Sequence, residues 1–431
     1  PAFTGLRRFF RIGWVECHCL FSMIGRGERP CRTQKEDFST DMSDFDDIRP
    51  YEDREVIQVI DRLLIDDDFL DFISRWRAPF LTRLLPRIVR SVVQTSLKKQ
   101  LNHVSTVLDF QEIVASYVGK LLKDTTTAFN HAGLEGLSTD TAYLFVSNHR
   151  DIAADSMLVN FALFYAGHGT VHIAVGDNLI QKQFATDLMR LNKSFVIRRS
   201  VEGAKKVYAA LLQSSRFIHH SLSEGYSVWI AQSEGRAKDG IDRTDSAIVK
   251  MFMLANRNAQ TPFGDLIEAL NIVPVSISYE YDPCDLLKAK ELYCIDQKGG
   301  YTKPEGEDLV SLAKGLAEFK GAVNLRFCEP LRGCFETPDE VAAELDRHIL
   351  SNYHVYPSNY IALSRIEDDA YREVWSKLKD EYAEIASREK ETEFEDRLNQ
   401  CPVEHRPYFL KMYANPLVSR DSLSLAPAAA P

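Results

Sequence analysis

The spacing of apolar residues changes repeatedly along the middle of the chain. Between residues 135 and 336, apolar runs of strand length alternate with stretches whose apolar positions recur every three or four residues. The expected strands are 143–147, 171–175, 194–198, 227–231, 272–279 and 323–328. The expected helices lie near 152–166, 181–191, 202–224, 245–257 and 306–320. This alternation predicts an α/β fold with helices on both faces of one sheet.

Two helical regions flank this α/β domain, which we place at residues 136–335. Residues 42–135 show helical spacing, and so does a C-terminal extension over residues 336–431. The heavily charged run 366–400 predicts a solvated helix. The Pro- and Ala-rich tail from Leu425 to Pro431 is expected to be disordered.

The first 41 residues differ from the rest of the chain. They begin with Pro1 and not with Met, show no steady periodicity and carry three of the eight cysteines. We expect residues 1–41 to be a non-native or disordered leader and Met42 to be the natural start. Cys17-His18-Cys19 with Cys31 matches no standard zinc spacing, so no metal site is predicted there.

Composition narrows the class of protein. With 431 residues, of which 45% are hydrophobic and 26% charged, the chain has the make-up of an ordinary globular protein. A net charge of −10 argues against nucleic acid as a partner, because nucleic-acid binding needs a basic face. No apolar run approaches the roughly 18 residues that span a bilayer. The eight cysteines form no Cys-x-x-Cys pair, which favours a reducing, cytoplasmic location.

The charge pattern reverses near residue 72. Residues 41–71 hold twelve acids and three bases, whereas residues 72–108 hold seven bases and no acid. The bases are Arg75, Arg77, Arg83, Arg87, Arg90, Lys98 and Lys99. Apolar residues at spacings of three and four lie between them, with Pro79 and Pro86 marking helix starts or a kink. The segment 75–99 therefore fits an amphipathic helix docked on the inner face of an anionic membrane, or a packed helix with solvated arginines.

The residues after the strand 143–147 carry the chemistry most suited to catalysis. His149 lies at a strand-to-helix junction, followed by Asp151 and Asp155, and Asn148 can cap the helix. A carboxylate that holds one imidazole nitrogen leaves the other nitrogen to accept a proton, so these residues can form a general base. The alternative is that they are ordinary polar residues of a helix start, where the helix dipole favours aspartate.

Two further strand ends carry cations. The residues are Arg198 and Arg199 after one strand, and Glu234, Gly235, Arg236 and Lys238 after another. Guanidinium groups suit phosphate, glycine lets the backbone approach a ligand, and ligands bind at the carboxyl ends of strands in α/β sheets. Together with His149 these residues predict a phosphate-plus-base site, although each cation taken singly fits a surface ion pair equally well.

Four blocks in this order resemble the glycerolipid acyltransferase family, and especially its glycerol-3-phosphate acyltransferase branch. The blocks are residues 148–155, with the histidine and aspartates; 195–208, with Phe-Val-Ile-Arg-Arg; 234–240, with Glu-Gly and basic residues; and 273–280, with a proline in a strand. In the family's pattern four residues separate the histidine from the aspartate, whereas five separate His149 from Asp155. In the third block the arginine directly follows Glu234-Gly235, one residue tighter than the pattern.

The resemblance implies a mixed sheet flanked by helices and an acyltransferase of phospholipid synthesis. Such an enzyme moves a fatty acyl group from acyl-CoA or acyl-carrier protein to a hydroxyl of glycerol 3-phosphate or 1-acylglycerol 3-phosphate. His149 is implied as the general base, oriented by Asp155 or, as the nearer alternative, by Asp151. The acceptor phosphate is then held by Arg198, Arg199, Arg236 and Lys238, in a pocket that Glu234 and Gly235 shape. Neither a metal nor another cofactor is needed.

Two other functions fit the same residues. A membrane-associated hydrolase of phosphorylated or acylated substrates could use the His-Asp pair. The chain, however, has no Gly-x-Ser-x-Gly, His-Glu-x-x-His or Walker motif to supply a nucleophile, a metal or a phosphate loop. An inactive lipid-binding module on the same fold is the second alternative, because Asp155 comes one position late in its block.

Overall fold

The structure, a computed structural model, describes residues 42–180, 182–257, 260–304 and 306–425. The expected leader and residues 426–431 of the expected tail lie outside the described residues. Seven strands of the described chain form one sheet in the order β1-β7-β6-β2-β5-β3-β4. They are β1 (Thr126–Ala132), β2 (Leu144–Ser147), β3 (His172–Gly176), β4 (Ser194–Ile197), β5 (Val228–Ala231), β6 (Ile272–Tyr279) and β7 (Gly321–Phe327).

The sheet is mixed, as the resemblance implies. Strands β6, β2, β5, β3 and β4 run parallel to one another. Strand β7 pairs with β6 in the antiparallel sense and with β1 in the parallel sense. The six strands expected from the sequence are confirmed, whereas β1 was not predicted and begins before the expected domain boundary at residue 136. Its sequence Thr-Thr-Ala-Phe-Asn-His-Ala leaves most of this edge strand exposed, so it lacks a clear apolar alternation.

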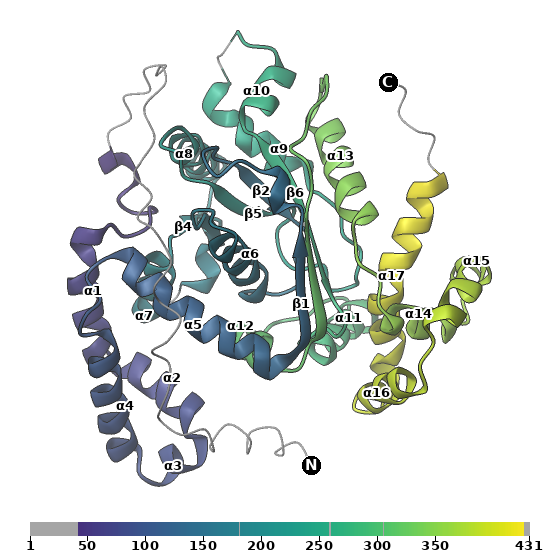
Figure 1. Cartoon of the computed structure of the whole chain (residues 1–431), viewed down its shortest axis with the longest axis horizontal. Coiled ribbons are helices and arrows are strands. Elements are labelled where there is room, and N and C mark those ends of the chain that lie inside the picture. The colour runs from purple at the N-terminus through teal and green to yellow at the C-terminus, as the bar shows by residue number, and fades with distance from the viewer. Residues whose placement is uncertain (1–41, 181, 258–259, 305, 426–431) are drawn as a thin grey trace. The chain divides into compact units, whose positions relative to one another are not determined.

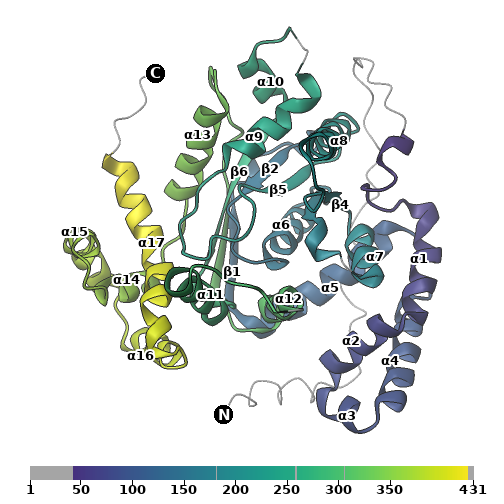
Figure 2. The ribbon, with the colours of Figure 1, turned by 180° about the vertical axis from the view of Figure 1, so that it is seen from behind.

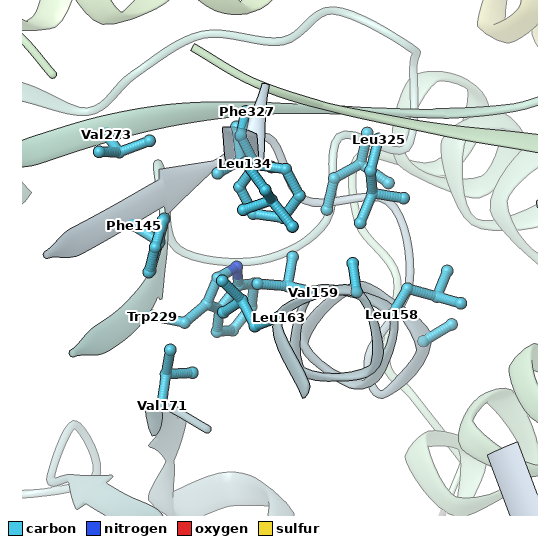
Figure 3. Close-up of a cluster of buried hydrophobic side chains, with 14 of the residues drawn as sticks. Leu134, Phe145, Leu158, Val159, Leu163, Val171, Trp229, Val273, Leu325 and Phe327 are labelled. Carbon is cyan, nitrogen blue, oxygen red and sulfur yellow. The ribbon is translucent and has the colours of Figure 1, made fainter. Parts of the chain in front are cut away.

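Helices cover both faces of the sheet. Alternate residues of a strand point to opposite faces, so Phe145 and Trp229 pack on one side with α5 (Val107–Thr125) and α6 (Ala154–Tyr165). In Figure 3, Trp229 lies beside Val159 and Leu163 of α6. Leu144 and Val228 face the other side. The helices there are α8 (Ala204–Ser223), α9 (Ser246–Met253), α10 (Phe263–Ala269) and α13 (Pro338–Ser351).

The helices before the sheet form a separate apolar cluster with α7 (Gln183–Leu191). They are α1 (Asp53–Ile65), α2 (Asp67–Arg77), α4 (Pro86–Leu101) and the start of α5, whereas the short helix α3 (Pro79–Leu84) contributes no residue to the cluster. Pro79 and Pro86 are the first residues of α3 and α4, which confirms that they mark helix starts. Proline is tolerated at that position because the first amides of a helix have no partner within it.

The C-terminal helices build a fourth cluster, which includes residues of α11. They are α11 (Asp285–Lys298), α14 (Pro357–Ser364), α15 (Asp369–Ile385), α16 (Arg388–Leu398) and α17 (Arg406–Leu425). The charged run 366–400 is not the single solvated helix that we expected, because it breaks into α15 and α16 and buries Phe394 and Leu398. In Figures 1 and 2, α1–α4 and α14–α17 lie at opposite ends of the view, with the sheet between them.

The remaining elements are short or lie beside the site. They are α12 (Glu307–Ala317) and the 3₁₀ helices η2 (Met42–Phe45), η3 (Leu134–Gly136), η4 (Asp177–Leu179), η5 (Leu254–Asn256) and η6 (Val403–His405). Among the described helices, none combines the length and the apolar character that crossing a bilayer requires.

Candidate active site

The loop between β2 and α6 brings His149 and Asp155 together. Strand β2 lies between β5 and β6 and ends at Ser147, so the residues that follow leave the carboxyl edge of the sheet. The His149 Nδ1 atom lies 2.9 Å from Asp155 Oδ2. The Asp155 carboxylate is fully buried in the first turn of α6, whereas the His149 side chain keeps partial access to solvent. The carboxylate expected to arrive late in the sequence is therefore the one that contacts the imidazole.

Three other donors hold the Asp155 carboxylate. Its Oδ2 accepts the backbone N–H groups of Arg150 at 2.7 Å and Asp151 at 2.9 Å, and its Oδ1 accepts the Tyr279 hydroxyl at 2.7 Å. Burial, together with the nearby aspartates, raises the pKa of Tyr279 well above its ordinary value, so its hydroxyl stays a donor. The same Oδ2 accepts a hydrogen bond from Nδ1–H of His149. The Nε2 atom is then the nitrogen left to accept a proton.

Asp151 has a different task from Asp155. Its Oδ1 accepts the N–H groups of Ala153 at 3.0 Å and Ala154 at 2.8 Å, which satisfies free amides at the start of α6. Its Oδ2 is buried without a hydrogen-bond partner among the described residues and faces Gly315 of α12. Burial first, and the neighbouring Asp155 second, raise the pKa of Asp151. The structure thus makes Asp151 a helix cap and not the partner of His149.

The prediction that Asn148 caps α6 is wrong. The Asn148 side chain instead bonds the backbone N–H of Ile277 at 2.8 Å and its carbonyl at 2.9 Å, and donates to Asp242 at 3.1 Å. Because β6 runs beside β2, an amide that pairs with its backbone anchors the loop to the sheet. No feature of the sequence distinguishes this amide from a helix cap, since asparagine serves equally well in both positions.

The loop after β5 lies beside His149. The Ala237 N–H donates to the His149 carbonyl at 2.8 Å, which fixes the loop carrying Glu234, Gly235 and Arg236 beside the histidine. The Nη1 atom of Arg236 is buried and has no hydrogen-bond partner among the described residues. Arg199 Nη1 lies 3.6 Å from Glu234 Oε1. The loop after β5 therefore lies beside His149, and Arg199 approaches that loop at Glu234.

Two of the predicted phosphate-binding cations lie in other surroundings. Lys238 Nζ donates to Glu291 Oε1 of α11 at 2.6 Å. Arg198 forms an ion pair with Asp47, just after η2, and lines a hollow against α8. The predicted group of four cations is thus divided: Lys238 pairs with α11, and Arg198 and Arg199 at the end of β4 point in different directions.

Sequence reasoning missed three residues that shape this site. Tyr279 stands in the fourth block, but nothing in its position showed that its hydroxyl reaches Asp155. Trp229 of β5 donates to Ser147 Oγ at 3.1 Å and lies edge-on to His149, with 6.3 Å between ring centroids. Lys288 of α11, a helix that the sequence did not predict, donates to the Arg150 carbonyl at 2.7 Å. In the described part of the chain, no three His, Cys, Asp or Glu side chains are grouped so as to hold a metal ion.

Comparison with known proteins concerns the part of the chain that holds this site. Residues 128–278, which run from β1 into β6, match the family model described as Acyltransferase. A glycerol-3-phosphate acyltransferase of Hamiltonella defensa is 26% identical over 191 residues, which are 44% of this chain and 21% of that protein. The chain therefore spans about a fifth of the length of this curated relative. Both of these matches are to acyltransferases.

A solved structure was also matched. The 1-acyl-sn-glycerophosphate acyltransferase PlsC from Thermotoga maritima aligns over 69% of this chain and 94% of its own, with 14% identity and a TM-score of 0.36. This similarity is too low to transfer any property to the chain.

Proposed function

We propose that this protein transfers a fatty acyl group from an acyl thioester to a hydroxyl of glycerol 3-phosphate or 1-acylglycerol 3-phosphate. The observation that carries the proposal is the His149–Asp155 pair at 2.9 Å beside a loop whose Arg236 has a buried, unpartnered Nη1 among the described residues. A base next to an unsatisfied guanidinium suits an acceptor that has both a hydroxyl and a phosphate. The name of the Hamiltonella relative supports the same acceptor class.

The reaction needs only a positioned base and bound substrates. Nε2 of His149 takes the proton of the acceptor hydroxyl as its oxygen attacks the thioester carbonyl carbon. A C–O bond forms, the C–S bond breaks, and the leaving thiolate receives the proton from the imidazolium. Asp155 stabilises that imidazolium throughout, while Arg199 and Arg236 hold the acceptor phosphate near the base.

We also propose that the segment 75–99 docks on an anionic membrane. Along α3 and α4, Phe80 is 74% exposed, Ile88 59% and Val92 64%, and Leu81, Leu84 and Leu85 extend the same exposed set. Val93 and Leu97 of α4 pack into the protein, so these helices have a second apolar face that nothing in the described chain covers. Arg83 and Arg87 lie beside that face without an ion pair among the described residues. Apolar side chains flanked by cations match the interface of an anionic bilayer.

The proposed activity is tested with radiolabelled acyl-CoA and each acceptor in turn. We expect wild-type protein to form a labelled glycerolipid and His149→Ala to form none while keeping its thermal unfolding midpoint. Release of free fatty acid without a lipid product identifies a hydrolase. Vesicle binding without any turnover identifies a lipid-binding module. Near-normal transfer by His149→Ala ends the proposal for this site.

A further inference from the structure

The last helix of the described chain contacts the loop that carries Arg236. The side chain of Asn415, on α17, donates from Nδ2 to the backbone carbonyl of Asp239 at 2.7 Å. Asn415 is only 5% exposed, so its amide lies inside the protein. Helix α17, drawn in yellow in Figures 1 and 2, belongs to the C-terminal extension and lies beyond the residues 128–278 that match the Acyltransferase family model. A part of the chain outside that match therefore reaches a loop of the candidate active site.

A second contact between α17 and this loop lies one residue further on. Gly240 has a φ of +80°, which favours glycine, and a Cβ there would lie 2.0 Å from the carbonyl oxygen of Met412. Pro416, four residues after Met412, lies inside α17 and has no N–H, so that carbonyl cannot accept the usual helical hydrogen bond. A left-handed glycine in the loop thus meets the point of α17 where a proline interrupts the helical bonding.

The amide of Asn415 is held in one orientation from its other side. The Tyr371 hydroxyl, on α15, donates to Asn415 Oδ1 at 2.7 Å. Because the amide oxygen faces Tyr371, the NH₂ group faces Asp239. A rotated amide would place two carbonyl oxygens against each other at Asp239 and leave buried polar groups unpaired. Helices α15 and α17 therefore hold the Asp239 carbonyl together.

These contacts bear on the position of Arg236. The Ala237 N–H donates to the His149 carbonyl at 2.8 Å, and two residues later Asn415 holds the Asp239 carbonyl. The Nη1 atom of Arg236 is buried without a hydrogen-bond partner among the described residues. The position of this guanidinium therefore depends on how firmly the backbone that follows it is held.

We propose that Asn415 is a positioning residue of the acceptor site. It acts through the Asp239 carbonyl and holds the loop so that Arg236 meets the acceptor phosphate. The inference rests on the proposed function, in which Arg236 binds that phosphate, and it extends the site to the C-terminal helices. The phosphate takes no part in bond making, so Arg236 contacts it equally before and during the reaction. A loosened loop therefore weakens acceptor binding and spares the chemical step.

The test compares Asn415→Ala and Tyr371→Phe with the matched control Asn359→Ala, all in the full chain. Asn359 of α14 is also a buried amide and donates to the Tyr413 carbonyl of α17 at 2.8 Å, but it makes no hydrogen bond to the loop in the described chain. We expect the KM for the acceptor, glycerol 3-phosphate or 1-acylglycerol 3-phosphate, to rise about tenfold in Asn415→Ala and less in Tyr371→Phe. The kcat and the KM for acyl-CoA should stay within about twofold of wild-type values. The control should keep the wild-type acceptor KM.

Hydrogen–deuterium exchange provides a second readout that needs no turnover. The backbone amides of residues 233–241 should exchange faster in Asn415→Ala and Tyr371→Phe than in the wild type, and Asn359→Ala should leave their exchange unchanged. If Asn415→Ala does not fold, the test rests on Tyr371→Phe, which loses a single hydroxyl.

The outcomes separate this inference from the proposed function. If the wild type acylates no acceptor, calorimetric titration with glycerol 3-phosphate replaces the KM. Weaker binding together with faster loop exchange then supports the positioning role, and only the acyl-transfer proposal fails. An acceptor affinity that neither variant changes overturns the inference, whatever the exchange shows. So does an equal loss of affinity in Asn359→Ala, because any loosening of α17 would then have the same effect.

Discussion

The buried ammonium of Lys288 donates a hydrogen bond to the carbonyl oxygen of Arg150 at 2.7 Å, across 138 positions of sequence. The same Nζ forms an ion pair with Asp282. The Arg150 guanidinium in turn binds Asp242 and the Gly240 carbonyl. Lys288 therefore fixes the backbone of the residue that follows His149.

Lys288→Met should weaken both stability and catalysis. It leaves the Asp282 carboxylate buried without its cation, which should lower the free energy of unfolding by about 3–5 kcal/mol. It also frees the Arg150 carbonyl, so kcat should fall in the remaining folded protein. Lys288→Arg, which keeps the charge, should recover part of both losses. Urea unfolding and kcat at a temperature where the variant is folded provide the measurements, and wild-type values for Lys288→Met contradict the role.

The two aspartates near His149 should differ in their effect on turnover. Asp155→Asn loses the acceptor that sets the imidazole tautomer, so kcat should fall by about 10²–10⁴-fold. Asp151→Asn keeps an oxygen that can accept from Ala153 and Ala154, so stability should change by less than about 1 kcal/mol. Steady-state kinetics measure kcat for both variants. If Asp151→Asn lowers kcat more than Asp155→Asn does, Asp151 is the residue that orients the imidazole.

Gly315→Ala should disturb the site through Asp151. A Cβ at Gly315 would lie 2.1 Å from Asp151 Oδ2, and two backbone bonds hold that carboxyl in place. We expect a loss of about 1–3 kcal/mol in unfolding free energy and a lower kcat. Gly119→Ala on α5 is the control, because its Cβ meets only the Phe161 ring at 3.7 Å. It should stabilise the protein by about 0.5–1 kcal/mol, and equal effects of the two substitutions exclude the clash.

Alkaline pH should stabilise the fold through Lys320. Burial lowers the pKa of this side chain from 10.5 to about 8. Between these two values the unfolded chain holds a proton that the folded chain has released, so stability rises with pH in this window. The gain is up to about 3 kcal/mol. Unfolding at pH 7.5 and 10.5 should show this rise in the wild type and a smaller one in Lys320→Met. Equal slopes in the two proteins contradict the prediction.

The arginines of α3 and α4 should separate into two groups. Arg83→Gln/Arg87→Gln should lose about 2 kcal/mol of affinity for anionic vesicles, or roughly 30-fold, with little change in stability. Arg90 pairs with Asp67 and Asp71, so Arg90→Gln should mainly affect stability. Phe80→Ser should weaken binding to anionic and neutral vesicles alike. Sedimentation with vesicles at low and high salt measures these effects. If the wild type does not bind vesicles at low salt, the segment 75–99 is a packed helix and not a membrane-docking one.

The sequence predicted the parts of the site that depend on local pattern. The strand before His149, the helix after it and the family resemblance together pointed to His149, with Asp155 or Asp151 as its partner. The sequence could not reveal Tyr279 as a donor or Arg198 as a residue of a second hollow, because those contacts depend on how distant strands and helices pack. Asn148 shows the limit most clearly, since its amide could equally have capped a helix but pairs with β6 instead.

The contacts that support the loop of His149 come from segments that the ribosome makes at very different times. Arg150 depends on Asp242 and Lys288, and Asp285, three residues before Lys288, is bound by Tyr413 of α17. Gly240 packs so tightly against the Met412 carbonyl that a side chain there would collide with it. A ribosome releases α6 long before α17, and domains generally fold from the N-terminus during synthesis. The loop that carries His149 therefore gains the supports that depend on α17 only after that helix has left the ribosome.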